Sequence, residues 1–254
     1  MYDLLILLIA GLGAGLITGF FSASAVLFAA PVLVLFLDMS AYVAVGISLA
    51  IDILASAVSA WIYYRNGHVK IQKSLLLLVF ALIFVIIGSY LSKFIPSTNL
   101  SLITALGILV MGVLIYRKSS KDHVFAKPLN VSKHALMWYT ILAGSLIGLI
   151  AGIFGAGGGI AILFALMFLL RFKIHDAIGT SVLLMIFIAT TGSAMHFYFD
   201  KFPVSYLIVG VIGGIIGSLV ASKIANKLSN KILTKIVGVV LFILGLGLLV
   251  KLFI

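Results

Sequence analysis

One carboxylate is the residue of this chain whose type and position point most directly to chemistry. Asp52 lies in the middle of an apolar segment, residues 41–64. An ionised side chain at the centre of a membrane span costs about 2.5–3.5 kcal/mol on insertion scales, so such a residue is a candidate for function. A carboxyl group that takes up and releases a proton could carry the coupling proton of a transporter. A structural hydrogen bond to neighbouring hydroxyl groups is the alternative.

A run of glycines is the second such feature. Residues 148–159 read GLIAGIFGAGGG. Glycine costs about 1 kcal/mol per residue in a helix interior relative to alanine, so the run predicts a break in a long apolar segment. Within a membrane, a break is tolerated only where it is buried in protein or lines a cavity. The helix after the break presents unpaired N–H groups and the positive end of its dipole, which favour an anion. The alternative is that the glycines only allow close helix packing.

A weaker copy of this stretch occurs 133 residues earlier in the chain. Residues 15–23 read GLITGFFSA against GLIAGIFGA at 148–156, and six of these nine positions are identical. Residues 44–48, AVGIS, likewise match residues 177–181, AIGTS. The chain is therefore predicted to be an internal duplication, with its first break at residues 20–24. Interrupted apolar segments in corresponding positions point to the binding site of a transporter.

The predicted anion site combines the two breaks with hydroxyl groups that follow them. Its residues are Ser22, Ala23, Ser24, Gly155, Gly157, Gly158 and Gly159 at the breaks, and Ser48, Thr180 and Ser181 near the starts of the next helices. For these last three, the alternative is a hydrogen bond to the preceding turn. Gly158→Val is expected to weaken anion binding more than Gly213→Val, which would disturb only helix packing. His196, near a span end, is expected to be an aromatic-belt or capping residue.

The composition places these residues in a polytopic membrane protein. The chain has 254 residues, of which 64% are hydrophobic and 9% charged, and its mean hydropathy is +1.36. No soluble core needs that much apolar sequence. The net charge of +11 lies in short loops between apolar segments, so we expect it to fix topology and expect no nucleic-acid partner. The chain has no cysteine and no enzyme motif, and we expect no cofactor, no metal and no catalysis.

Each half is predicted to hold a broken helical segment followed by three spans. The first repeat, 1–116, has its broken segment at 4–37 and its spans at 41–64, 74–91 and 100–116. A polar cytoplasmic linker at 117–134 follows. The second repeat, 135–254, has its broken segment at 135–170 and its spans at 177–199, 204–224 and 232–250. The glycines at 210, 213, 214 and 217 indicate tight helix packing.

The distribution of Lys and Arg distinguishes a re-entrant hairpin from a kinked span. If the second broken segment returns to the side it entered, 14 basic residues lie on one side and 3 on the other; if both segments cross, the split is 10 against 7. The positive-inside rule prefers the hairpin. Extended to the first segment by the duplication, this gives two inverted repeats with both termini outside. The arms 4–19 and 135–152 are long for half a bilayer and must tilt or start in the interface.

Nearly the whole chain resembles the sulfite exporter TauE/SafE family, also called the toluene-sulfonate uptake permease family. The resemblance rests on residues 152–159, GIFGAGGG, on residues 177–181, AIGTS, and on the weaker counterparts at 19–24 and 44–48. It implies secondary transport of sulfur-containing anions such as sulfite or organosulfonates, often as export. Where the family's glycine-rich run would stand in the first half, this chain has SASAV at residues 22–26.

We therefore expect an all-helical, inverted-repeat transporter of the plasma membrane that moves a small anion by alternating access, with protons coupled through Asp52. Its partners would be the lipid bilayer, the anion and protons, and a homodimer is compatible with the sequence. A channel or passive pore for a small ion or neutral solute is the alternative, and a non-transporting scaffold is a third reading. A channel needs a continuous polar path, whereas the sequence offers one central polar cluster.

Overall fold

The computed structural model describes residues 2–95, 132–155, 158–172, 174–199, 204–225 and 242–251, with a few separate positions at 102–117 and 239. The elements in these parts are helices: α1 (Tyr2–Phe21), α2 (Val26–Leu37), α3 (Ala41–Arg65), η1 (Ile71–Ser74), α4 (Leu75–Ser92), α6 (Lys133–Phe154), α7 (Gly158–Phe168), α8 (Ile174–Phe199) and α9 (Val204–Ala225). The predicted spans 100–116 and 232–250 are described only in part, and most of the linker lies outside the described residues.

Six of these helical segments are long and apolar enough to cross a membrane. They are Tyr2–Phe20, Ala41–Arg65, Ile71–Ser92, His134–Phe154, His175–Phe199 and Tyr206–Ala225. The all-helical polytopic class is thereby confirmed. Both breaks lie where they were predicted, because α1 ends at Phe21 before α2, and α6 ends at Phe154 before α7. By length, α1 and α6 could each cross a bilayer, so their re-entrant path in the membrane stays a prediction.

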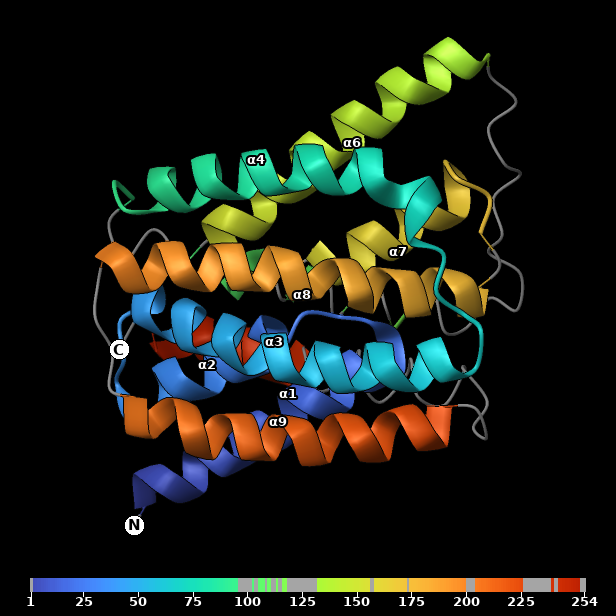
Figure 1. Ribbon diagram of the computed structural model, residues 1–254. Coiled ribbons are helices and arrows are strands. Elements are labelled where there is room, and N and C mark those ends of the chain that lie inside the picture. Colours follow the sequence, from blue (N-terminus) through green and yellow to red (C-terminus); the bar gives the residue numbers. More distant parts are fainter. Residues whose placement is uncertain are drawn as a thin grey trace.

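The helices α3 and α8 pack against each other at the centre of the bundle (Figure 1). The remaining long helices flank this pair, with α9 beside α3 and α4 beside α8. In Figure 1, α1 begins at the lower left, beside the N-terminus, whereas α6 begins at the upper right. The two broken segments thus run into the bundle from opposite ends of the view.

Each half supplies the helix against which the broken segment of the other half packs. Helix α1 lies along α9, and α6 lies along α4. A Cβ atom added to Gly11 or Gly15 would overlap the carbonyl groups of Gly210 and Gly214 on α9. Glycine therefore allows backbones to approach here, as is common where helices pack within membranes. The tight packing predicted for the glycines of α9 is confirmed.

The backbone repeats itself where the short helices begin and end. Ser22 and Gly155, 133 positions apart, both adopt left-handed conformations, with φ of 56° and 62°. Asp38 and Arg171, also 133 positions apart, do the same at 52° and 58°. For Ser22 this conformation costs about 1–2 kcal/mol. Both breaks therefore begin with a residue in the same left-handed conformation, although only the second has glycine there.

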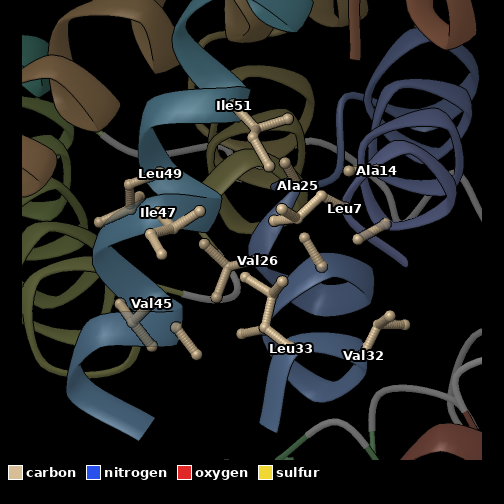
Figure 2. Packing of buried hydrophobic residues seen from close by; sticks show 14 of the residues in the cluster. Leu7, Ala14, Ala25, Val26, Val32, Leu33, Val45, Ile47, Leu49 and Ile51 are labelled. Carbon is tan, nitrogen blue, oxygen red and sulfur yellow. The ribbon is translucent and has the colours of Figure 1, made fainter. Parts of the chain in front are cut away.

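The short helix α2 is buried between α1 and α3. It carries no polar side chain, and its buried residues lie in its first eight positions, whereas Phe36 near its end is exposed. Figure 2 shows Val26 and Leu33 of α2 facing Val45 and Ile47 of α3, with Leu7 of α1 on the other side. Within a membrane, such a core is held mainly by van der Waals packing, because lipid tails are as apolar as these side chains. This packing keeps the first break in the interior.

Candidate functional site

The two breaks meet inside the bundle. We call residues 22–25 the first tip and residues 155–159 the second tip; Ala156 and the candidate Gly157 lie outside the described residues. Ser24 Oγ lies within hydrogen-bond distance of Gly155 O, at 3.1 Å, so the first tip contacts the second. A Cβ atom on Gly159 would overlap Ser22 O, so only glycine fits at this position. The sequence predicted each tip, and the structure adds that they touch.

Asp52 lies at the first tip, beneath the N-terminal end of α2. Its Oδ2 accepts from the backbone N–H of Ala25 at 3.0 Å and from Ser24 Oγ at 2.9 Å. Its Oδ1 accepts from Thr18 Oγ1 at 3.1 Å and from Ser56 Oγ at 3.0 Å. The carboxyl group is fully buried. It therefore already occupies N–H and hydroxyl donors that the sequence assigned to a substrate anion.

The second tip has no such carboxylate among the described residues. The position equivalent to Asp52 is Met185, whose sulfur lies 3.3 Å from the place a Cβ atom of Gly158 would take. The first N–H groups of α7, from Gly158 onward, have no partner within their own helix. The helix dipole adds roughly half an elementary positive charge at this end. An anion would therefore find its most favourable backbone donors at the second tip.

The cluster is closed to the outside. Each of its polar side chains is at most 1% exposed: Thr18, Ser22, Ser24, Asp52, Ser56 and Ser181. Its groups are hydroxyls, carbonyls, amides and one carboxyl. The described residues include no group of three or more His, Cys, Asp or Glu side chains that could hold a metal ion. The arrangement suits a small solute held by hydrogen bonds.

The family model for the sulfite exporter TauE/SafE family matches this chain over residues 7–248. The chain belongs to the TauE/SafE family. The chain is also similar to two relatives from Bacillus subtilis (strain 168) that are named as probable membrane transporters. One, a probable membrane transporter protein YdhB, is 28% identical over 200 residues, which cover 78% of this chain and 80% of the relative. The other, a probable membrane transporter protein YunE, is 25% identical over 203 residues, covering 73% and 71%.

In this TauE/SafE protein, the three hydroxyl candidates on the long helices that follow the broken segments have different partners. Ser181 on α8 contacts Ser22 Oγ at the first tip and donates to Ile178 O at 3.0 Å. Ser48 donates to Ala44 O at 2.6 Å, which is the bond to the preceding turn given above as its alternative. Thr180 Oγ1 accepts from the backbone N–H of Lys70 at 2.9 Å. Of the three, only Ser181 is brought to the tips by a hydrogen-bond contact.

His196 is the residue whose surroundings differ most from expectation. It is fully buried, so the aromatic-belt interpretation is wrong. Its Nε2 lies 3.3 Å from Gly152 O in the last turn of α6, and its Nδ1 lies 3.2 Å from Tyr42 O. The alternative of a capping role agrees with this geometry, because carbonyl groups at the end of a helix lack partners within it.

Two further polar residues of the cluster were not predicted from the sequence. Thr18 and Ser56 both donate to Asp52, and each left a signal that could have been used. Ser56 follows Asp52 by four positions, so both lie on one face of α3. Thr18 stands in the last turn before the first break, where a polar side chain in an apolar helix needs a partner. A search for partners of Asp52 would have found them.

Proposed function

We propose that this TauE/SafE family member is a secondary transporter that carries a small anion across the plasma membrane by alternating access, with coupled protons. Sulfite or an organosulfonate is the proposed substrate, and export the proposed direction. The observation that carries the proposal is the meeting of the two broken helices at a buried polar cluster. Broken helices in corresponding positions of two halves are typical of a transporter's binding site.

The closed state of the cluster supports a carrier rather than a channel. A channel needs a continuous polar path, whereas the polar side chains at the tips are at most 1% exposed. A carrier has to close its site to both sides at one stage of its cycle. The opposite directions of the broken segments in Figure 1 fit the inverted repeats that we propose for this cycle.

The donors at the tips support a weakly held anion. The backbone N–H groups of α7 and the hydroxyl groups of Ser22 and Ser181 can donate to the oxygens of a sulfite or sulfonate group. Among the described residues, no Lys or Arg side chain contributes to this cluster. Dipoles and hydroxyls bind an anion less tightly than a buried cation does, which allows release on the other side.

Asp52 supports coupling to protons. An ionised carboxylate at the first tip would repel an anion at the second, because charges in a buried site are poorly screened. A proton on Asp52 would remove this repulsion. The anion and the proton would then bind together and cross together, outward where the anion gradient exceeds the opposing proton gradient.

The experiment is exchange of labelled sulfonate in proteoliposomes that contain the purified protein. A carrier couples entry of labelled substrate to exit of unlabelled substrate. A pore lets each equilibrate independently of the other, and a scaffold moves neither. Saturating sulfite or sulfonate should also stabilise the protein, by about 2.7 kcal/mol at 100 times Kd, whereas carboxylates should not. Absence of both exchange and stabilisation would refute the proposed function.

Proton coupling is tested by Asp52→Asn in the same proteoliposomes. We expect the variant to fold and to exchange anion, because Asn keeps the size and one acceptor of Asp. Uptake driven by a pH gradient should be lost. Unchanged gradient-driven uptake would mean that Asp52 is structural.

A further inference from the structure

Two buried hydroxyl groups beside Asp52 each face two acceptors. Ser24 Oγ lies 2.9 Å from Asp52 Oδ2 and 3.1 Å from Gly155 O. Thr18 Oγ1 lies 3.1 Å from Asp52 Oδ1 and 3.0 Å from Ala23 O. A hydroxyl group has a single proton to donate. Each hydroxyl can therefore satisfy the carboxyl group or the backbone carbonyl, but not both at once.

The protonation state of Asp52 decides between these two acceptors. Hydrogen bonds to an ionised carboxylate are roughly twice as strong as those between neutral groups, so an ionised Asp52 draws both hydroxyl protons. A protonated carboxyl group is a weaker acceptor and can itself donate. Ser24 Oγ then either accepts a hydrogen bond from the protonated carboxyl group or has no hydrogen bond to it. In both cases Ser24 donates its hydroxyl proton to Gly155 O. The Ala25 N–H can bond to Oδ2 in either state.

We propose that Ser24 is a positioning residue that couples the proton on Asp52 to the contact between the two tips. Protonation of Asp52 forms the Ser24–Gly155 hydrogen bond, and loss of the proton breaks it. This inference rests on the proposed function, which it deepens by naming how the proton acts on the second half. It requires only rotation of a hydroxyl group, because both acceptors are already within hydrogen-bond distance.

Asp52 is the titratable group whose protonation decides which acceptor the Ser24 hydroxyl group bonds to. Its carboxyl group contacts only hydroxyl groups and one backbone N–H among the described residues. On α9, Ser222 bonds to Ser59 of α3. The other titratable groups on α3 and on the elements packed around it stand elsewhere or have other partners. They are Tyr42, Tyr63, Tyr64 and Arg65 on α3, Tyr2 and Asp3 on α1, Asp38 after α2, His175, Asp176, His196 and Tyr198 on α8, and Tyr206 and Lys223 on α9. Of these, His196 is fully buried, and it faces the carbonyl groups of Tyr42 and Gly152.

A matched control stands on α4. Ser89 is fully buried and donates to Gly152 O at 3.3 Å, in the last turn before the second tip. It thus resembles Ser24 in burial and in donating to a carbonyl group at the end of α6, but Asp52 is not its partner. Ser89→Ala removes one such hydrogen bond without affecting the carboxyl group.

The first measurement is exchange of a labelled organosulfonate, whose charge does not change over the range used, at equal pH on both sides. In the wild type and in Ser89→Ala we expect rates at about pH 5 and about pH 8 to differ by about tenfold, the effect of one charge-assisted hydrogen bond. In Asp52→Asn the rate should not depend on pH. In Ser24→Ala the pH dependence should be smaller than in the wild type, because only the repulsion between Asp52 and the anion remains. If Ser24→Ala fails to fold, Ser24→Cys keeps the volume with a weak donor.

The second measurement does not depend on transport. Hydrogen exchange of the two tips, corrected for pH with an unstructured peptide, should be slower at low pH in the wild type and in Ser89→Ala. Asp52→Asn and Ser24→Ala should show no such change. A wild-type pH dependence in Ser24→Ala, in either measurement, would overturn the inference. Failure of every protein to exchange anion would refute the proposed function instead, and the hydrogen-exchange result would still decide the coupling.

Discussion

At the scale of single residues, Gly159 decides how closely the two tips approach. A side chain there would overlap the carbonyl oxygen of Ser22, whereas one at Gly158 would meet Met185 and Ala151 at 3.3 Å. Gly213 lies at a helix contact as predicted, because its Cβ atom would lie 2.6 Å from Leu8 O on α1. The smaller effect of Gly213→Val on anion binding stays a prediction. Gly158 is the matched control for Gly159, since it is in the same tip and an added Cβ atom would meet only side-chain atoms, of which those of Met185 can move.

We predict that Gly159→Ala disrupts the tips more than Gly158→Ala. The first change forces the backbones of the two tips apart and should cost about 1–3 kcal/mol, as overpacking of a buried site does. The second should cost less than about 1 kcal/mol, because a methionine side chain can move aside. Thermal unfolding and anion titration of both purified variants measure this difference. Equal losses in the two variants would show that the tip contact is unimportant.

At the scale of elements, the segment between α3 and η1 is tied to the beginning of α8. Asp176 is 7% exposed and bonds to Lys70 Nζ and, at 3.1 Å, to His68 Nδ1. The backbone N–H of Lys70 reaches Thr180 one turn further along α8. This segment therefore covers Thr180, a residue that the sequence assigned to the anion site.

We predict that Asp176→Asn loosens this segment. Lys70 is half exposed, so the lost interactions should amount to about 1 kcal/mol, and the segment should open about fivefold more often. Trypsin cleavage after Lys70 should become faster in proportion, because cleavage follows the open population. The control is Asp38→Asn. This change breaks the ion pair between Asp38, which follows α2, and Lys251, and it should not change cleavage at Lys70. Unchanged cleavage in Asp176→Asn would mean that other contacts hold the segment.

At the scale of the whole molecule, the two halves are interleaved rather than set side by side. Helix α9 of the second half lies along α1 of the first, and α4 of the first half lies along α6 of the second. The central α3–α8 pair also joins the halves (Figure 1). Movement of one broken segment must therefore be transmitted to helices of the other half.

The orientation of the halves in the membrane is tested by single cysteines. We predict that cysteines at Ser119 and Ser229 are labelled only from the cytoplasmic side, and one at Ser97 only from outside. The reason is the split of 14 basic residues against 3. Labelling of Ser119 and Ser229 from opposite sides would exclude the second hairpin and, with it, the inverted repeat.

The sequence by itself determined the class of the protein, its family and the places of both breaks. These properties are carried by local pattern: long apolar runs, clustered glycines and a repeat at a constant offset. The helix α2 and both tips were therefore predicted to within a few residues. Even Ser22, which lacks the glycine of its counterpart Gly155, takes the same left-handed conformation, because the surrounding segments repeat.

Only the tertiary structure decided what the tips face. The backbone donor of α2 that Asp52 occupies stands 27 positions before it in the chain, and Ser24 finds Gly155 across 131 positions. The burial of His196 and the attachment of Lys70 to Thr180 are likewise contacts between distant segments. A hydroxyl or carboxyl group shows its chemistry in the sequence but not its partner, since the partner depends on how the helices pack. Helix packing is also what places the single hydroxyl proton of Ser24 between two acceptors, Asp52 Oδ2 and Gly155 O.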